Sequence, residues 1–354
     1  MTSKDRVHHV LNRKKADRPA TSLRCTPEVW ESLIHHFDVS TPVDVLDRLD
    51  IDLRWVSIPF IGPKERSAAT LSSEGTDFWG IGMKAAKNEY NTYYEIAYHP
   101  LAEASSVDEI YAYDWPSLDW WDYSKIKDNI KVHKKTDDRA IMFFAGGAFE
   151  TPWYLRGMEQ FLTDLYENPE IVTAICSKVR EYYYGRAVRV LDAADGEIDI
   201  IGSGGDIGGQ ENLMLSPTLW REMIKPHTAG LIKPFKEMGL GTFYHSCGSV
   251  AQVIDDLAEI GVDLLDPIQV GAKGMEPESL FTHFGDKISF HGAIDEVDLL
   301  PHASPDQIFE ETTRIMSILG GNGGYIVSPS HQVQGDTPVE NLLAVYQAVK
   351  NFQY

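Results

Sequence analysis

Short apolar runs alternate with longer amphipathic segments along most of the chain. A run of about four to eight apolar residues, bounded by Gly, Pro or polar residues, predicts a buried strand. Residues 217–237, 249–260 and 304–319 have the spacing of amphipathic helices. The eight predicted strands cover residues 18–24, 52–58, 140–145, 198–202, 241–245, 263–268, 288–291 and 324–328.

Eight strands that alternate with helices favour an α/β fold of the (β/α)8 TIM barrel type. The chain has 354 residues, and such barrels run from about 250 to more than 400 residues. A doubly wound open sheet is the alternative. It would need a glycine-rich phosphate turn after the first strand, and the glycine cluster at 202–209 does not lie there. We therefore predict one barrel domain, residues 1–354.

The segment 59–139 interrupts the alternation between the second and third predicted strands. A connection of this length carries secondary structure of its own, and we predict a small hairpin and helices laid over the barrel mouth. Its aromatic side chains could stack on a flat substrate or form a satellite core, and Trp79 and Tyr94 are our candidates for substrate contact. The aromatic residues are Trp79, Tyr90, Tyr93, Tyr94, Trp115, Trp120 and Trp121.

The composition excludes several classes of partner. The chain carries 53 Asp and Glu against 32 Lys and Arg, a net charge of −21, which would repel nucleic acids and anionic membranes. The N-terminus is polar, and no stretch approaches the roughly 18 apolar residues of a membrane span. Three cysteines, Cys25, Cys176 and Cys247, are too few for a disulfide framework. These features predict a cytoplasmic protein, with Cys176 as a core thiol.

Metal-ligating residue types meet at the end of the strand predicted over 241–245. In an extended strand residues i and i+2 point to the same side, so His245 and Cys247 would share a face. A His-x-Cys pair by itself is often accidental. With His331 after the eighth strand, however, it would give three ligands suited to zinc, and three ligands leave one coordination position open for chemistry.

Other polar side chains also follow the predicted strands, where a barrel places its catalytic groups. Asp206, Glu150 and His291 are candidates for orienting or protonating a substrate, and Gln269 is a candidate for binding it. Each has a structural alternative as well: Asp206 could support its glycine turn, for example, and Asp295 could cap the next helix. The full set is Cys25, Glu150, Asp206, His245, Cys247, Gln269, His291, Asp295 and His331.

These motifs resemble those of the uroporphyrinogen decarboxylase superfamily over essentially the whole chain. The resemblance implies the same (β/α)8 barrel, and it implies a monomer or a homodimer. The matching stretches are 6–12 with Arg18-Pro19, Gly205-Asp-Ile-Gly-Gly-Gln210 with Leu215-Ser-Pro217, Tyr244-His-Ser-Cys-Gly-Ser249, His291-Gly-Ala-Ile-Asp295, and 323–331 with 336–341.

The superfamily contains two broad chemistries. Uroporphyrinogen decarboxylase carries an arginine-rich motif near its N-terminus for the substrate's carboxylates, whereas residues 20–27 hold only Arg24. A polyanionic tetrapyrrole needs several cations, so porphyrinogen decarboxylation is disfavoured. The other branch comprises zinc-dependent methyltransferases that act on the cobalt of a corrinoid (cobalamin) protein. Its motif is similar to His245-x-Cys247, with a distant Cys in a Ser-Pro-Gly-Cys loop. That loop reads Ser328-Pro-Ser-His331 here, which puts thiol methylation in doubt.

A histidine as third ligand changes the charge of the predicted centre. Zn²⁺ with one thiolate keeps a charge of about +1, and this charge favours a role as a Lewis acid that binds a substrate oxygen. We therefore expect methyl transfer from a small methylated donor, a methoxylated aromatic, to the cobalt of a corrinoid partner protein. The alternatives are transfer from methylcorrinoid to a thiol or folate, a metal-free lyase, and a non-catalytic corrinoid-binding module.

Overall fold

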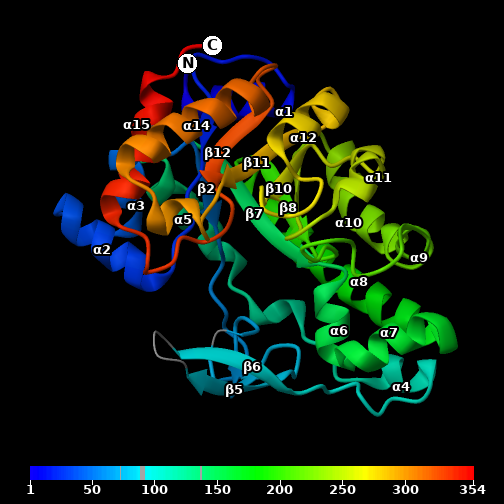
Figure 1. The fold of residues 1–354 in the computed structure, drawn as a ribbon. Coiled ribbons are helices and arrows are strands. Elements are labelled where there is room, and N and C mark those ends of the chain that lie inside the picture. The colour runs from blue at the N-terminus through cyan, green and yellow to red at the C-terminus, as the bar shows by residue number, and fades with distance from the viewer. Residues whose placement is uncertain (72, 88–91, 136–137) are drawn as a thin grey trace.

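The computed structural model describes residues 1–71, 73–87, 92–135 and 138–354. Its main sheet has eight parallel strands in the order β1-β12-β11-β10-β9-β8-β7-β2, with helices packed around the outside (Figure 1). The sheet confirms the predicted (β/α)8 barrel, and every predicted strand overlaps an observed one. The strands are β1 (Ala20–Thr21), β2 (Leu53–Val56), β7 (Ala140–Gly147), β8 (Ile200–Gly204), β9 (Gly241–His245), β10 (Leu264–Ile268), β11 (Ser289–Ile294) and β12 (Tyr325–Pro329).

A buried carboxylate joins β1 to β2, the two ends of this hydrogen-bonded order. Asp52 is 0% exposed, and its Oδ2 accepts hydrogen bonds from the backbone N (2.9 Å) and the hydroxyl (3.0 Å) of Thr21. Arg6 and Arg18 form ion pairs with the same carboxylate at 2.5 and 2.7 Å. The gap between β1 and β2 is thus bridged by these side-chain contacts and by a backbone hydrogen bond from Asp52 N to the carbonyl oxygen of Thr21 at 3.2 Å.

The helices of the barrel follow the predicted segments with two local differences. Residues 217–237 form two helices, and Pro226 lies in the first turn of the second one, where its missing N–H leaves no hydrogen bond unmade. Residues 249–260 divide into a 3₁₀ turn, η3 (Ala251–Val253), and α11 (Ile254–Glu259). The other helices are α1 (Ser3–Leu11), α2 (Pro27–Phe37), α3 (Pro42–Leu49), α6 (Glu150–Arg156), α7 (Met158–Glu167), α8 (Pro169–Ala194), α9 (Pro217–Met223), α10 (Lys225–Glu237), α12 (Pro277–Phe284), α13 (Leu299–His302), α14 (Pro305–Leu319) and α15 (Val339–Asn351).

None of the helices within the described ranges is both long and apolar enough to cross a membrane.

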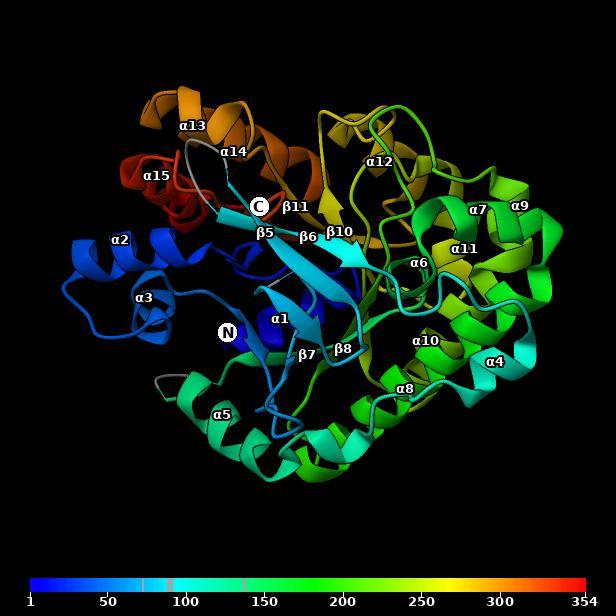
Figure 2. The same ribbon diagram turned by 90° about the horizontal axis from the view of Figure 1, so that it is seen from below.

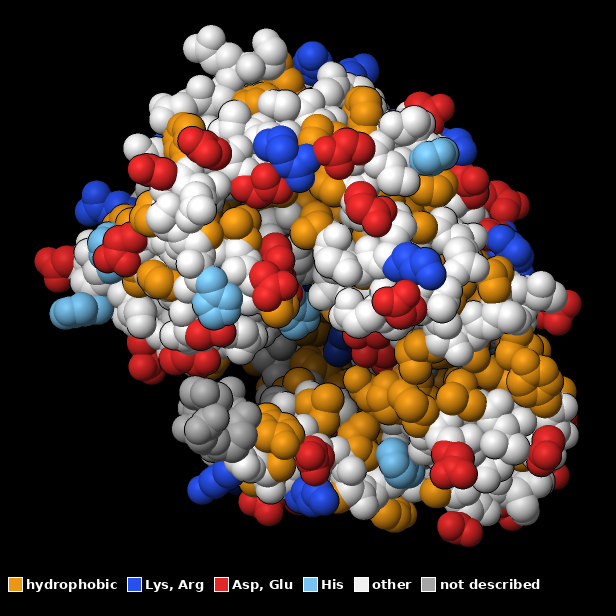
Figure 3. Space-filling model, in the orientation of Figure 1, with side chains coloured by type: hydrophobic (Ala, Val, Ile, Leu, Met, Phe, Trp, Pro, Cys, Tyr) orange, Lys and Arg blue, Asp and Glu red, His pale blue; other side chains and the backbone are white. Residues whose placement is uncertain are grey.

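The segment between β2 and β7 contains a second, four-stranded sheet in the order β3-β4-β5-β6. Its antiparallel β5–β6 hairpin lies across the carboxyl ends of the barrel strands in both ribbon views (Figures 1 and 2). The space-filling view shows a hollow between this segment and the barrel (Figure 3). The elements are β3 (Arg66–Ser67), β4 (Gly75–Asp77), β5 (Gly82–Lys87), β6 (Thr92–Tyr98), α4 (Val107–Ala112), η1 (Leu118–Trp120), η2 (Tyr123–Lys125) and α5 (Ile126–His133).

Trp79 lies in a satellite core between this segment and α8. Its side chain is 1% exposed and packs edge-on against Tyr182 and Tyr183. The indole Nε1 donates a hydrogen bond to the hydroxyl of Tyr183 at 3.3 Å. Of the other predicted aromatic residues, Tyr94 is half-buried on β6, and Tyr90 lies outside the described residues.

Candidate metal centre

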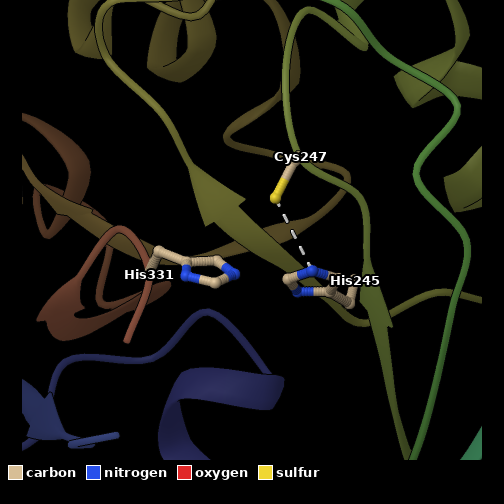
Figure 4. A group of neighbouring side chains, drawn as sticks. All are labelled: His245, Cys247 and His331. Atoms are coloured by element: carbon tan, nitrogen blue, oxygen red, sulfur yellow. Dashed lines mark hydrogen bonds between the residues drawn. The ribbon is translucent and has the colours of Figure 1, made fainter. Parts of the chain in front are cut away.

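Three side chains from the carboxyl ends of β9 and β12 converge on one point. His245 ends β9, Cys247 follows two residues later, and His331 comes two residues after β12. One ligand atom of each lies within 4.8 Å of the other two, and the three side chains point toward one another (Figure 4). His245 and His331 face each other with their ring centroids 6.1 Å apart.

The spacing of these atoms fits a tetrahedral zinc ion. The Sγ of Cys247 lies 3.7 Å from Nε2 of His245. Zinc bonds of about 2.1 Å to nitrogen and about 2.3 Å to sulfur, at a tetrahedral angle, place the two ligand atoms about 3.6 Å apart. The His245–Cys247 pair is therefore already at bonding geometry, and His331 lies close enough to complete a three-ligand set.

The loop that carries Cys247 is held by neighbouring strands. The backbone N of Cys247 donates to Oδ1 of Asp206, which follows β8, at 2.8 Å. The next residue, Gly248, donates its backbone N to Oε1 of Gln269 at 2.6 Å. Gly248 has φ of +81°, and a Cβ there would lie 2.6 Å from the carbonyl oxygen of Gly209, so only glycine fits. Asp206 and Gln269 thus fix the position of the thiol.

A fully buried carboxylate, which our sequence predictions did not include, orients His245. Oδ2 of Asp266, in β10, lies 2.5 Å from Nδ1 of His245, and this contact directs Nε2 toward Cys247. The same carboxylate lies 3.1 Å from Nη2 of Arg24 and 2.6 Å from Nδ1 of His291. Burial raises the pKa of Asp266, but Arg24 and the two histidines outweigh it and hold that pKa well below its ordinary value.

Burial and hydrogen bonding shift the pKa values of all three candidate ligands. Burial lowers the pKa of His245, but hydrogen bonds to Asp266 and Cys247 outweigh it and raise the pKa to about 10. Burial raises the pKa of Cys247. Burial, followed by the charge of His245, lowers the pKa of His331. Zinc binds neutral imidazole and thiolate, so its binding would displace the protons on His245 and Cys247.

Glu150 and Asp206 face the same centre. Oδ1 of Asp206 lies 3.6 Å from Nε2 of His245. Glu150 begins α6 beside Asp206, and burial, together with the charge of Asp206, raises the pKa of Glu150. The hydroxyl of Tyr154, one helical turn later, donates to Oε1 of Glu150 at 3.2 Å. Two of the predicted polar residues therefore adjoin the metal ligands, and Tyr154 is a neighbour that the sequence did not single out.

The remaining predicted residues have mainly structural surroundings. His291 is 0% exposed and lies between Asp266 and the ring of Phe243, whose centroid is 5.5 Å away. Because its side chain is fully buried, His291 cannot contact a substrate directly. It can act on the candidate metal centre through Asp266. Asp295 accepts a hydrogen bond from the backbone N of Val297 at 2.8 Å, in the turn before α13, whose N-cap is Asp298 and not Asp295. Cys25 is buried, and burial raises its pKa.

Two cavities lie near this end of the barrel. The larger, about 790 Å³, is a groove beside α13 and α14 that includes Asp295, Glu310 and Glu311 but none of the three candidate metal ligands. The smaller, about 500 Å³, lies between the barrel and the β2–β7 segment, and Trp55, Trp121, Phe143, Phe144 and Arg186 are among the residues that line it. None of the three candidate ligands lines the smaller cavity either, but Trp55 in its wall stacks on Arg24, which pairs with Asp266.

The fold and site define a (β/α)8 barrel with a mixed histidine–thiol centre at the carboxyl ends of its strands. Residues 80–352 match the uroporphyrinogen decarboxylase family, and the chain belongs to this family. It is 19% identical to a methylcobamide:CoM methyltransferase of Methanosarcina acetivorans over 100% of this chain and 99% of that protein. It is 27% identical to a methylated-thiol–coenzyme M methyltransferase of Methanosarcina mazei over 39% of this chain and 34% of that protein.

A solved structure described as a methyltransferase from Methanosarcina mazei has the same fold. It superposes with a TM-score of 0.71 and 17% identity, and the match covers 99% of both chains.

Proposed function

We propose that this chain is a methyltransferase that moves a methyl group from a methoxylated aromatic donor to the cobalt of a corrinoid carried by a partner protein. The observation that carries the proposal is the convergence of His245, Cys247 and His331 within 4.8 Å at the barrel mouth. The full-length similarity to a methylcobamide:CoM methyltransferase supports methyl transfer involving a corrinoid.

The ligand set favours an oxygen-bound methyl group. Zinc held by two neutral imidazoles and one thiolate would keep a charge of about +1 and supply Lewis acidity toward a substrate oxygen. A phenolate is a poor leaving group, so charge stabilisation at its oxygen is what an aryl methyl ether needs. A second thiolate in place of His331 would neutralise the centre and remove this advantage.

The side chains around the candidate ligands would orient His245 and the aromatic donor and would deliver a proton to the leaving phenolate. In the proposed reaction the bond between the ether oxygen and the methyl carbon breaks, the methyl group passes to cobalt, and the phenolate oxygen takes up a proton. Asp266 keeps Nε2 of His245 directed at the ligand cluster. Glu150 and Asp206 adjoin that cluster and are the candidates for orienting the aromatic donor or for delivering the proton.

Methyl transfer from methylcorrinoid to a thiol is the second candidate. The names of both methyltransferase relatives, which refer to CoM or coenzyme M, favour it. The two candidates differ in the direction in which the cobalt spectrum changes, so one assay separates them.

Metal analysis of protein purified without added zinc tests the centre directly. We expect about one zinc per chain, and a loss of most of it in Cys247→Ser and in His245→Ala. Cys25→Ser is the matched control, because Cys25 is a buried thiol outside the ligand set, and it should retain its zinc. A zinc content below half an equivalent that none of the three substitutions changes would remove the zinc proposal.

A methyl-donor screen with a reduced corrinoid protein tests the reaction. Methoxyarenes should convert the absorption of Co(I) to that of methylcobalt, and Cys247→Ser should abolish the conversion. If methoxyarenes leave Co(I) unchanged while a thiol demethylates methylcobalt, the second candidate replaces the first.

A further inference from the structure

Arg186, in the middle of α8, is a buried cation that lacks an acidic partner. It is 9% exposed, and within the described parts of the chain no carboxylate lies within ion-pair distance of its guanidinium. Its Nη2 donates to the carbonyl oxygen of Ala145 at 2.6 Å, while its Nε is buried without a hydrogen-bond partner. Burying a guanidinium in this way is costly unless something compensates the charge.

The other arginines that are equally buried show what compensation looks like. Each of them forms an ion pair with an aspartate at 2.5 to 2.8 Å: Arg6 with Asp52, Arg54 with Asp47, Arg139 with Asp50, and Arg156 with Asp164. Arg186 departs from this pattern. Because no carboxylate of the described residues pairs with it, its guanidinium is available to bind an anionic ligand.

The guanidinium of Arg186 lines the aromatic cavity of about 500 Å³, a volume in the range of sites for small ligands. It lies over the ring of Trp121 at 4.7 Å and over that of Phe143 at 5.7 Å. Cation–π contacts of this kind hold a guanidinium in place without neutralising it. Trp55 and Phe144 complete the flat apolar lining, so the cavity combines surfaces for an aromatic ring with a fixed positive charge.

The walls of this cavity adjoin the metal centre. Arg24 stacks on Trp55 at 4.8 Å and forms the ion pair with Asp266, which orients His245. Phe144 reaches the same place from β7. A Cβ built on Gly204 would lie 3.2 Å from the Phe144 ring and 3.0 Å from the Cβ of His245. Phe144 and the Trp55–Arg24 pair therefore connect the walls of this cavity to His245 and Asp266 of the candidate centre.

We propose that Arg186 is the specificity residue that binds the carboxylate of the methyl donor, which makes the donor a methoxylated aromatic acid. A planar guanidinium can donate two parallel hydrogen bonds to a carboxylate, while Trp55, Phe144 and Trp121 enclose the aromatic ring. The identity of the donor rests on the proposed methyl transfer, but the anion site itself can be measured without it.

The test compares the binding of an acid with that of its neutral analogue. Titration calorimetry of the zinc-loaded protein should show 4-methoxybenzoate binding at least tenfold more tightly than 4-methoxybenzamide, which has the same shape and no charge. Arg186→Gln should lose this preference and Arg186→Lys should keep part of it. Arg189→Gln is the matched control, because Arg189 lies one turn along α8, is exposed and pairs with Asp119, and it should bind both ligands like the wild type.

Equal affinity of the wild type for acid and amide would overturn the Arg186 proposal, as would an unchanged preference in Arg186→Gln. If Arg186→Gln does not fold, the wild-type comparison and Arg186→Lys still decide. The two proposals fail separately. If the protein prefers the acid but transfers no methyl group to cobalt, the methyltransferase proposal is overturned and the anion site stands. If acid and amide give equal rates of methyl transfer, the anion site is overturned and the methyltransferase proposal stands.

Discussion

The carboxylate of Asp266 lies 2.5 Å from Nδ1 of His245, and this contact determines which nitrogen of the imidazole faces Cys247. Histidines that ligate zinc commonly donate their second ring N–H to a carboxylate, which fixes the ring and raises its basicity. Asp266 is buried with Arg24 and His291 around it. The candidate centre therefore has a supporting layer as well as its three candidate ligands.

Asp266→Asn should weaken zinc binding about 10- to 100-fold, because an amide cannot supply the negative charge that stabilises the ligating imidazole. Competition with a chromogenic chelator at neutral pH measures the change. Asp263→Asn, at the other end of the same strand segment, is the control. Asp263 pairs with Lys236, away from the ligands, and this variant should bind zinc like the wild type. Equal zinc affinity of all three proteins would show that the contact does not support a metal.

His331→Cys should keep the zinc but slow demethylation of an aryl ether by about tenfold or more, a barrier increase of at least about 1.4 kcal/mol. The added thiolate cancels the residual positive charge of the centre, on which stabilisation of the leaving oxygen depends. Zinc content and single-turnover methylation of Co(I) together measure the effect, and His331→Ala, which should lose zinc, serves for comparison. Faster ether demethylation in His331→Cys would contradict the charge argument.

Asp52→Asn should lower the free energy of unfolding by about 1.5 to 3 kcal/mol, because it removes the buried anion that Arg6 and Arg18 share, although each keeps a second aspartate partner. Urea denaturation followed by circular dichroism gives the value. The exposed pair of Lys127 and Asp195 provides the control, since Lys127→Ala should change stability by no more than about 1 kcal/mol. A similar small effect in Asp52→Asn would mean that the carboxylate does not hold β1 and β2 together.

The buried imidazole of His227 in α10 should make stability depend on pH below neutrality. Burial, followed by the charge of Arg180, lowers the pKa of His227 from 6.5 to about 4. Because the unfolded chain binds this proton more readily, the contribution of His227 is complete above pH 6.5 and is lost as pH falls toward 4. That interval corresponds to roughly 3 kcal/mol.

His227→Gln should therefore flatten the decline in stability between pH 6.5 and 4, as measured by urea midpoints across that range. His283→Gln is the control, because His283 is exposed on α12. An identical pH profile in His227→Gln and the wild type would show that this imidazole titrates alike in the folded and unfolded chains.

The barrel could be predicted from sequence because most of its strands are apolar runs that alternate with helical segments. The run from Gly241 to His245 has the same bounds in the structure as in the prediction. The ligands could be brought together only by the rule that strand ends meet at one face of a barrel, since His331 lies far along the chain from Cys247. Local patterns predict which segments become strands, and the topology then places their ends.

The supporting residues were harder to predict because their roles depend on packing across strands. Asp266 lies within a predicted strand, and an acidic residue inside an apolar run was the signal that a partner must exist. Trp79 was expected at the substrate and lies in the satellite core, since an aromatic-rich segment does not reveal which face packs against α8. Arg186 has the same local context as other arginines of α8, and only the folded structure shows that it lacks an acidic partner.

The pairing of β1 with β12 has a consequence for the synthesis of this protein. The ladder partners of residues 20 and 21 are residues 326 and 327, so the two halves of this pairing are synthesised far apart in time. The first strand must therefore wait for the last, and the ring of eight strands cannot be completed before residues 326 and 327 have been made. Until then, the backbone groups of β1 that later pair with β12 form an open edge, which exposes the nascent chain to unwanted strand pairing.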